Sequence, residues 1–148
     1  MSRGPQKAQP FSIRLRNEDD RLVTDEARRL KRPRGTIVEE YASEAIRTRR
    51  HPGIAFRGND YRRRAWVIGT GLDVWEIVAL TRDFASEREL ADEYDLAPGQ
   101  IRIALAYYKE FTDEVDDLIA RGRRSEEKLL TRYPFIQTLD EAAAGGGQ

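Results

Sequence analysis

The chain has 148 residues, enough for one ordinary domain or two small ones, and its 26 Lys+Arg balance its 26 Asp+Glu. Charged residues make up 35% of the chain and hydrophobic ones 39%, and no apolar run approaches the ~18–20 residues of a membrane helix, so we expect a helix-rich protein without a membrane partner. The absence of cysteine excludes disulfides and cysteine zinc sites, and the single histidine disfavours a Ser–His–Asp triad. Because the first ten residues lack the apolar stretch of a secretory signal, we expect a cytoplasmic location.

Charge is segregated along the chain. Residues 1–66 carry 17 basic and 9 acidic side chains, whereas residues 83–120 carry 3 basic and 11 acidic ones. This asymmetry predicts a polyanionic partner for the first part and a different task for the second. The alternative is that each charged run is a solvated helix face. This alternative explains any single run well, but it explains the segregation of charge along the chain less well.

The N-terminal residues predict a disordered basic arm over 1–10 and then a short strand. Residues 11–16 read F-S-I-R-L-R, a strict alternation of apolar and polar residues that is typical of a strand with one buried face. The two kinds of side chain point to opposite faces, Phe11, Ile13 and Leu15 to one and Ser12, Arg14 and Arg16 to the other.

Two helices follow the strand. Asn17 is expected to cap the first, and a capping-box pair, Thr36 with Glu39, is expected to begin the second. One strand and two helices in about forty residues cannot bury a core alone, and no cysteine is present to staple them. A second copy that pairs with the strand would complete the unit, so the sequence predicts a homodimer. Whether dimers pair into tetramers stays open.

Residues 11–50 resemble a ribbon-helix-helix DNA-binding domain, on the strand F-S-I-R-L-R, the helix start G-T-I-V-E-E and the stretch E-A-I-R at 44–47. The resemblance implies a dimer whose antiparallel ribbon enters the major groove of operator DNA. Ser12, Arg14 and Arg16 are then candidates for contacts with base edges, although they could instead only keep the strand edge charged. Arg34 and Thr36 are candidates for a phosphate contact at a helix N-terminus, with an ordinary cap as the alternative.

The second half of the chain predicts a short β-hairpin and several helices. Residues 54–57 and 65–68 flank the polar loop 58–61 of the hairpin, and helices are expected to start at Asp73, Ser86 and Pro98. Thr112 is expected to cap a last helix that extends at least to Ile119 and at most to Tyr133. Ala91, Asp95 and Ile101 have the spacing of a helix-turn-helix, although glycine is usual at the turn.

Residues 51–118 are similar to the bacterial antitoxin family DUF433, on the blocks H-P-G-I-A-F-R, G-T-G-L-D-V-W-E and Q-I-R-I-A-L-A-Y-Y. Genes of this family commonly lie beside a PIN-like ribonuclease toxin. The expected fold class is therefore mainly α. A ribbon-helix-helix domain over 11–50 precedes a helix-turn-helix-like antitoxin domain with a β-hairpin over 51–120, and a C-terminal helix and tail follow over 121–148.

The predicted helix-turn-helix lies in the acidic segment, so its carboxylates would approach phosphates at close range. Gln100 and Arg102 compensate poorly for them, and we expect this element to bind protein or dimerise. A better candidate for partner binding is the segment that follows, which combines arginines with apolar anchors. It comprises Arg121, Arg123, Arg124, Leu129, Leu130, Tyr133, Phe135 and Ile136. The alternative is a helix packed on its own domain.

Enzyme activity is not expected. The carboxylates stand at helix starts and on helix faces, which disfavours a metal-dependent nuclease, and Gly69-Thr70-Gly71 lacks the spacing of a phosphate-binding loop. His51 is interpreted as a linker residue, and no cofactor or metal is predicted. The leading hypothesis is an antitoxin that neutralises a PIN-like toxin and represses its own operon. The alternative is a stand-alone repressor whose second domain only oligomerises.

Overall fold

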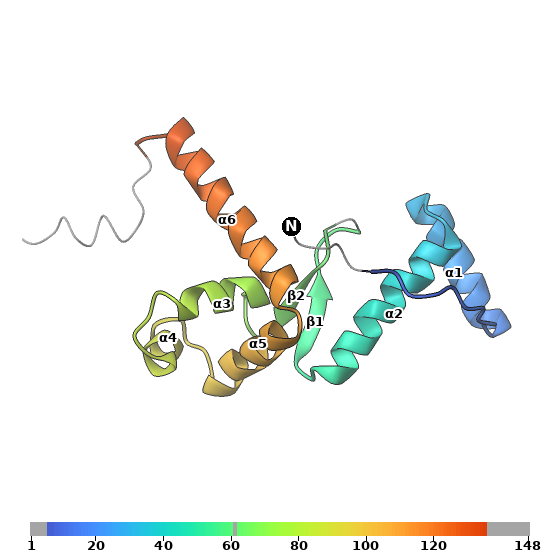
Figure 1. The fold of residues 1–148 in the computed structure, drawn as a ribbon, viewed down its shortest axis with the longest axis horizontal. Helices are drawn as coiled ribbons and strands as arrows, with labels where there is room; N and C mark the ends of the chain where they lie inside the picture. The colour runs from blue at the N-terminus through green and yellow to red at the C-terminus, as the bar shows by residue number, and fades with distance from the viewer. Residues whose placement is uncertain (1–5, 61, 136–148) are drawn as a thin grey trace, which may run out of the picture. The chain divides into compact units, whose positions relative to one another are not determined.

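The computed structural model describes residues 6–60 and 62–135, and this part of the chain is mainly helical (Figure 1). It contains six helices and one two-stranded antiparallel sheet. The elements are α1 (Asn17–Leu30), α2 (Arg34–Arg50), β1 (Ile54–Arg57), β2 (Arg64–Val67), α3 (Val74–Thr81), α4 (Glu87–Glu93), α5 (Pro98–Glu110) and α6 (Thr112–Arg132). No described helix has the length and apolar character needed to cross a membrane.

The chain divides into two compact units, residues 1–45 and 46–148, which are described separately. The boundary falls inside α2, so the last turn of this helix belongs to the second unit rather than to the predicted domain 11–50. Of the predicted basic arm, residues 6–10 are exposed and have no regular secondary structure, and residues 1–5 lie outside the described part. Tyr61 in the hairpin loop, Ile136 and the remainder of the predicted tail also lie outside it.

The strand predicted over residues 11–16 is not formed in this single chain, where residues 6–16 have no regular structure. A strand needs a hydrogen-bonding partner, and the predicted partner is the same segment of a second chain. Phe11 is therefore 83% exposed and Ile13 is 55% exposed, although the alternation assigned both to a buried face. The ribbon stays a prediction.

Both helix starts in the first unit differ from the predicted ones. The cap of α1 is Arg16 instead of Asn17, which is the first helical residue. Helix α2 begins at Arg34, so Thr36 lies inside the first turn and does not cap it. Pro33 explains this earlier start, because its ring presets a helical φ and its carbonyl accepts the first backbone bond, from Ile37 N at 3.2 Å.

The first unit has a very small core. Among its described residues, only Leu30 and Ile37 are buried hydrophobic side chains. Arg34 of α2 forms an ion pair with Asp20 of α1, and Tyr41 of α2 donates a hydrogen bond to the Glu26 carboxylate at 2.5 Å. Hydrogen bonds from Arg29 and Tyr41 lower the pKa of Glu26 to about 2. Polar contacts thus hold together a unit that buries little apolar surface.

The hairpin of the second unit follows the prediction, with its second strand one residue earlier. Ile54 pairs with Val67 and Arg57 with Arg64 in the antiparallel register. Gly58 leaves β1 with φ +114°, and a Cβ at this position would lie 2.4 Å from the carbonyl oxygen of Arg62. The turn therefore requires glycine.

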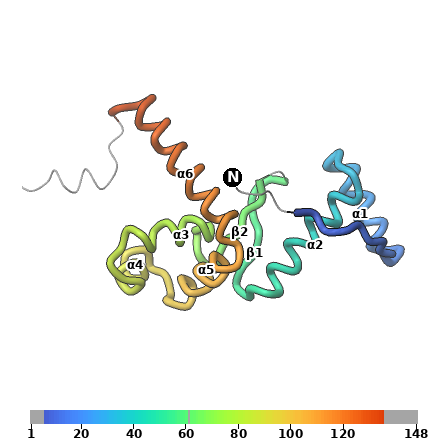
Figure 2. The backbone as a smooth tube through the Cα atoms, in the orientation of Figure 1, coloured from blue at the N-terminus to red at the C-terminus, as the bar shows by residue number. Residues whose placement is uncertain are grey.

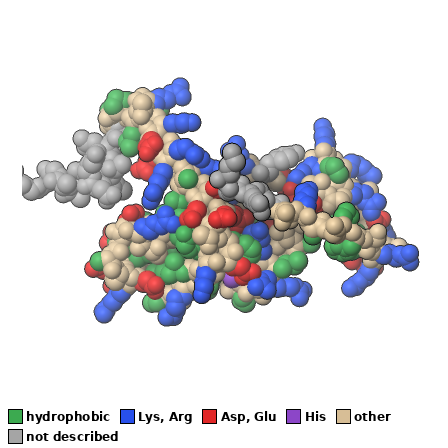
Figure 3. All heavy atoms as spheres, in the orientation of Figure 1, with side chains coloured by type: hydrophobic (Ala, Val, Ile, Leu, Met, Phe, Trp, Pro, Cys, Tyr) green, Lys and Arg blue, Asp and Glu red, His purple; other side chains and the backbone are tan. Residues whose placement is uncertain are grey.

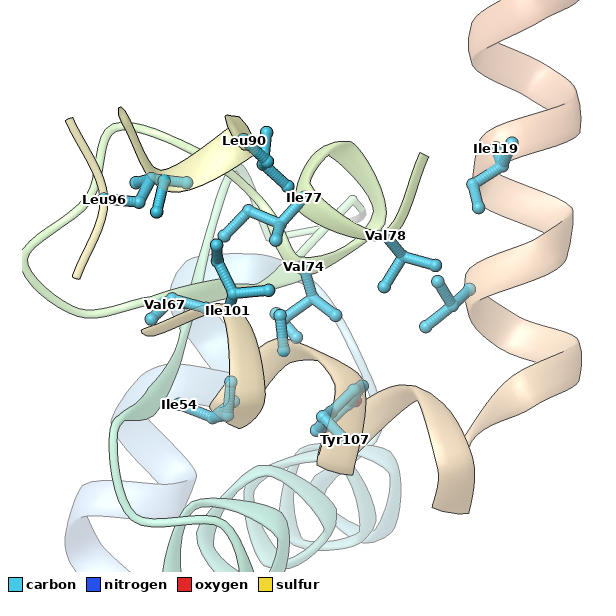
Figure 4. Close-up of a cluster of buried hydrophobic side chains, with 14 residues drawn as sticks. Ile54, Val67, Val74, Ile77, Val78, Leu90, Leu96, Ile101, Tyr107 and Ile119 are labelled. Atoms are coloured by element: carbon cyan, nitrogen blue, oxygen red, sulfur yellow. The ribbon is translucent and has the colours of Figure 1, made fainter. Parts of the chain in front are cut away.

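The core of the second unit lies between the hairpin and the four helices that follow (Figure 4). Both strands and all four helices contribute buried side chains, and Tyr107 is the largest of them. The core consists of Ile54, Ala65, Val67, Val74, Ile77, Val78, Leu90, Ala91, Leu96, Ile101, Ala104, Tyr107, Val115 and Ile119.

Helices α4 and α5 are joined by a short turn, as predicted. Ser86 caps α4 by accepting a hydrogen bond from the backbone N–H of Glu89 at 3.2 Å. Asp95 in the turn has φ +51°, a left-handed conformation that aspartate tolerates better than most residues. Pro98 is the first residue of α5. The residues therefore form a helix, a turn and a helix although the usual turn glycine is absent.

Helix α6 has two different halves. Val115 and Ile119 in its first half are buried in the core, whereas residues 123–132 are exposed except for the half-buried Leu130. The second half of α6 extends away from α3, α4 and α5 (Figures 1 and 2). The Thr112 hydroxyl donates to the carbonyl of Tyr108 at 2.8 Å, so it does not cap the helix as predicted. We refer to residues 123–135 as the distal α6 segment.

Candidate functional site

The predicted base-contacting residues lie on the surface of the first unit. Ser12, Arg14 and Arg16 are all exposed, and Arg16 accepts the first backbone bond of α1 from Asp20 N at 2.9 Å. Their side chains are available for a ligand. The ribbon that would place two copies of them side by side requires a second chain.

The start of the second helix differs from the predicted phosphate site. Arg34, the first residue of α2, pairs with the Asp20 carboxylate of α1. Thr36 is half-buried in the first turn. The structure therefore ties Arg34 to α1, and the free N–H groups of the helix N-terminus begin three residues earlier than predicted.

The distal α6 segment presents apolar and basic side chains to solvent. Leu129 is 48% exposed, Tyr133 39% and Phe135 79%. The Tyr133 and Phe135 rings pack edge to face at 5.9 Å, with the Arg132 guanidinium 5.8 Å from the Tyr133 ring. Lys and Arg side chains project along this half of the helix (Figure 3). All three predicted arginines of α6, Arg121, Arg123 and Arg124, are exposed.

This geometry combines the two interpretations of the C-terminal helix. Its first half packs on the second unit, which agrees with the alternative of a helix packed on its own domain. This packing extends to Gly122, which lies against the Trp75 ring. Beyond that contact the described residues provide no core for the apolar side chains of the helix. An aromatic and leucine cluster beside arginines has the composition of a protein-binding segment.

Sequence reasoning missed a polar cluster at the start of the second unit. Arg47 donates to the Tyr107 hydroxyl at 2.8 Å and to Glu114 at 2.9 Å, and its guanidinium lies 4.1 Å from the Phe111 ring centre. Burial raises the pKa of Tyr107, and Glu114 raises it further. Burial opposes the charge of Arg47, but Glu114 and the Tyr107 hydroxyl more than offset this and raise its pKa.

His51 belongs to the same cluster and is more than a linker residue. Its Nε2 lies 2.7 Å from Oε2 of Glu110, whose Oε1 accepts a hydrogen bond from Arg50 Nε at 2.8 Å. The hydrogen bonds from Arg50 and then His51 lower the pKa of the Glu110 carboxyl. No local pattern could reveal this cluster, because its partners are about sixty positions apart in sequence.

A buried carboxylate organises the hairpin. Asp73 is 2% exposed and accepts hydrogen bonds from Nε of Arg57 and Nε of Arg64, both at 2.8 Å. Trp75 Nε1 also donates to it, at 3.3 Å. The sequence indicated Asp73 only as a helix start, a role it also has, since its backbone N–H donates to Glu76 Oε1 at 3.3 Å.

The acidic side chains around the α4–α5 turn face solvent. Glu87, Glu89, Asp92, Glu93 and Asp95 are exposed. Within residues 6–60 and 62–135, no group of three His, Asp or Glu side chains is arranged to hold a metal ion. The exposed carboxylates would oppose the approach of a phosphate backbone to this face.

The second unit is, by class, a small helical unit with a β-hairpin and a helix–turn–helix arrangement. Residues 62–108, from the end of the hairpin loop to the last turn of α5, match the family model described as "Protein of unknown function (DUF433)". The match covers less than half of the chain. No curated protein and no solved structure gave a match.

Proposed function

We propose that this protein is an antitoxin, which binds operator DNA as a ribbon-helix-helix dimer and neutralises a PIN-like ribonuclease toxin. The observation that carries the proposal is the incomplete first unit. It buries only Leu30 and Ile37 among its described residues, while the alternating segment 11–16 lies exposed before α1. Pairing of this segment with its copy would cover Phe11 and Ile13 and align Arg14 and Arg16 on the opposite face.

Arginines on such a ribbon suit the reading of DNA. The guanidinium fork matches the O6 and N7 acceptors of guanine in the major groove, and a dimer doubles the number of forks. Residues 1–66, which comprise the first unit, the end of α2 and the hairpin, carry eight more basic than acidic side chains, and this surplus favours association with a polyanion. Repression follows if the bound dimer covers the promoter of its own operon.

The distal α6 segment supports the second activity. A PIN-like ribonuclease uses clustered carboxylates with a divalent cation, so an arginine fork can pair with its active site. Leu129, Tyr133 and Phe135 are exposed and could anchor the segment on the toxin beside that site. The family match at residues 62–108 adds support, because genes of similar proteins commonly lie beside such toxins.

The DNA-binding activity is tested by the double variant Arg14→Ala, Arg16→Ala. Each lost bidentate contact costs ~1–3 kcal/mol, so the affinity for the promoter duplex should fall at least tenfold with an unchanged circular dichroism spectrum. The control is Arg102→Ala, which removes an exposed arginine of α5, and this variant should bind the duplex with the affinity of the unchanged chain. Intact binding by the double variant would show that the ribbon does not read DNA.

A second candidate function is that of a stand-alone repressor whose second unit only oligomerises. Ile68 and Tyr94 favour it, because both are large hydrophobic residues of this unit, lie outside α6 and are 52% and 44% exposed. A protein of this kind would bind DNA normally and would have no effect on a neighbouring ribonuclease. Co-expression with the product of the adjacent gene, followed by co-purification, separates the two candidates.

A further inference from the structure

The hairpin of the second unit places two like charges opposite each other. Arg57 of β1 and Arg64 of β2 are directly paired in the antiparallel register. Like charges at such positions are destabilising. Here the pair is formed around a counter-charge, the buried Asp73 carboxylate.

Asp73 holds this pair in place without neutralising it. One carboxylate, 2% exposed, accepts a hydrogen bond from Nε of both arginines. The Arg57 guanidinium also lies 4.8 Å from the Trp66 ring centre, and its Nη2 donates to the Gly71 carbonyl at 2.9 Å. Two guanidinium groups are thus oriented by one buried charge, and both side chains remain more than a third exposed.

The charge of the hairpin region stays positive. Residues 54–73 contain four arginines and two aspartates, a surplus of two. Arg62, which precedes β2, is exposed. Preorganised arginines lose little side-chain entropy when they bind an anion, and their planar fork matches the oxygens of a phosphate.

We propose that Arg57, Arg62 and Arg64 form a second contact with nucleic acid, in which the hairpin binds the phosphate backbone of duplex DNA. The inference rests on the proposed DNA-binding function but concerns the unit outside the predicted ribbon. The three arginines extend from the end of β1 to the start of β2. This spread of positive charge fits the repeated phosphates of a duplex better than the acidic active site of a ribonuclease. The hairpin adds affinity without sequence preference, because phosphates carry no base information.

The test is a salt titration of DNA binding by the full-length chain. Dissociation constants of Arg62→Gln and of Arg62→Gln, Arg64→Gln are measured on a promoter duplex and on an unrelated duplex over a range of NaCl concentrations. Each lost phosphate contact lowers the slope of log K against log [salt] by ~0.9, so we expect reductions of about 1 and about 2 on both duplexes. The double variant Arg62→Lys, Arg64→Lys keeps both positive charges, so its slope of log K against log [salt] should equal that of the unchanged chain.

The control is Arg88→Gln, Arg102→Gln, which removes one exposed arginine from α4 and one from α5 and should leave the slope unchanged. Circular dichroism verifies that the hairpin variants fold, and Arg62→Gln alone leaves the Asp73 contacts intact. An unchanged slope in that folded variant overturns the inference, as does a loss of toxin neutralisation with normal DNA binding. If Arg14→Ala, Arg16→Ala binds normally while the hairpin variants fail, the ribbon assignment is wrong and the hairpin contact stands.

Discussion

Gly122 shows how a single residue determines the position of α6. A Cβ at this residue would lie 2.7 Å from Cζ3 and 2.8 Å from Cη2 of Trp75, closer than such atoms can approach. Trp75 cannot easily move aside, because its Nε1 donates to the buried Asp73. Glycine costs up to about 1 kcal/mol inside a helix, and the close packing of α6 on α3 explains why it is tolerated here.

We predict that Gly122→Ala lowers the free energy of unfolding by about 1 kcal/mol. Overpacking typically costs ~1–3 kcal/mol, and the better helix propensity of alanine offsets part of this. Chemical denaturation measures the change. Gly99→Ala is the matched control, since nothing lies within 4 Å of a Cβ there, and it should leave stability unchanged or slightly higher. Equal effects of the two substitutions would show that Trp75 does not constrain α6.

Glu110 makes the stability of the second unit depend on pH. Hydrogen bonds from Arg50 and His51 lower the pKa of its carboxyl below the ordinary 4.5. The carboxylate stabilises the fold only while ionised, so its contribution is complete above pH 4.5 and is lost as the pH falls through the lowered value. In denaturation between pH 6 and pH 3, Glu110→Gln should lose less stability than the unchanged chain. Parallel curves would contradict the assignment.

If residues 11–16 form one strand of the ribbon, substitutions at neighbouring positions should have opposite effects on dimer formation and DNA binding. Ile13→Asp should dissociate the dimer in analytical ultracentrifugation, because a carboxylate in the ribbon core would be buried without a partner, at a cost of several kcal/mol. Ser12→Asp should leave the dimer intact and weaken binding to the promoter duplex, because Ser12 is predicted to lie on the face of the ribbon that contacts DNA. If both variants stay dimeric, the segment does not form the dimer interface.

The distal α6 segment is expected to carry toxin binding through one face. Leu129→Ser, Tyr133→Ser removes two exposed anchors four residues apart and should weaken toxin binding at least tenfold, since interface anchors of this kind each contribute more than ~1 kcal/mol. Glu127→Ser, Thr131→Ser has the same spacing on another face and serves as the control. Isothermal titration with the purified toxin measures both. Equal affinities would move the interface to another surface of the second unit.

At the scale of the whole molecule, local signals predicted most of the helices and the hairpin. Ser86 and Pro98 marked helix starts correctly, because capping hydrogen bonds and a preset φ act within a few residues. The caps expected at Asn17 and Thr36 were wrong by one and three residues, since Arg16 and Pro33 precede them with extended or preset geometry. The first residue of a helix is hard to predict where several adjacent residues could each cap it.

The candidate sites could be predicted only where they depend on composition. The arginines and apolar residues of the C-terminal helix were singled out from the sequence, because their combination after the acidic segment is a matter of composition, and the structure places Leu129, Tyr133 and Phe135 on the surface. The cluster of Arg47, Tyr107 and Glu114 could not be found, since tertiary packing brings its members together. The ribbon is predicted from the sequence, but it requires a second chain.

Under the proposed function, the first unit binds DNA and the second binds the toxin. The charge of residues 83–120 agrees with this division, because they carry eight more acidic than basic side chains and would be repelled by DNA. The basic hairpin that precedes this acidic segment in the chain is the exception. Under the proposed hairpin contact, the second unit would also bind the phosphate backbone.

Inhibition of a ribonuclease by this chain is tested by the activity of the PIN-like protein expected to be encoded beside it. RNA cleavage by that purified protein is measured while the chain is added in increasing amounts. We predict that cleavage stops near equimolar concentrations and that the Leu129→Ser, Tyr133→Ser variant fails to stop it. Undiminished cleavage by a ribonuclease exposed to an excess of folded, DNA-binding chain would contradict the claim and leave the protein a repressor alone.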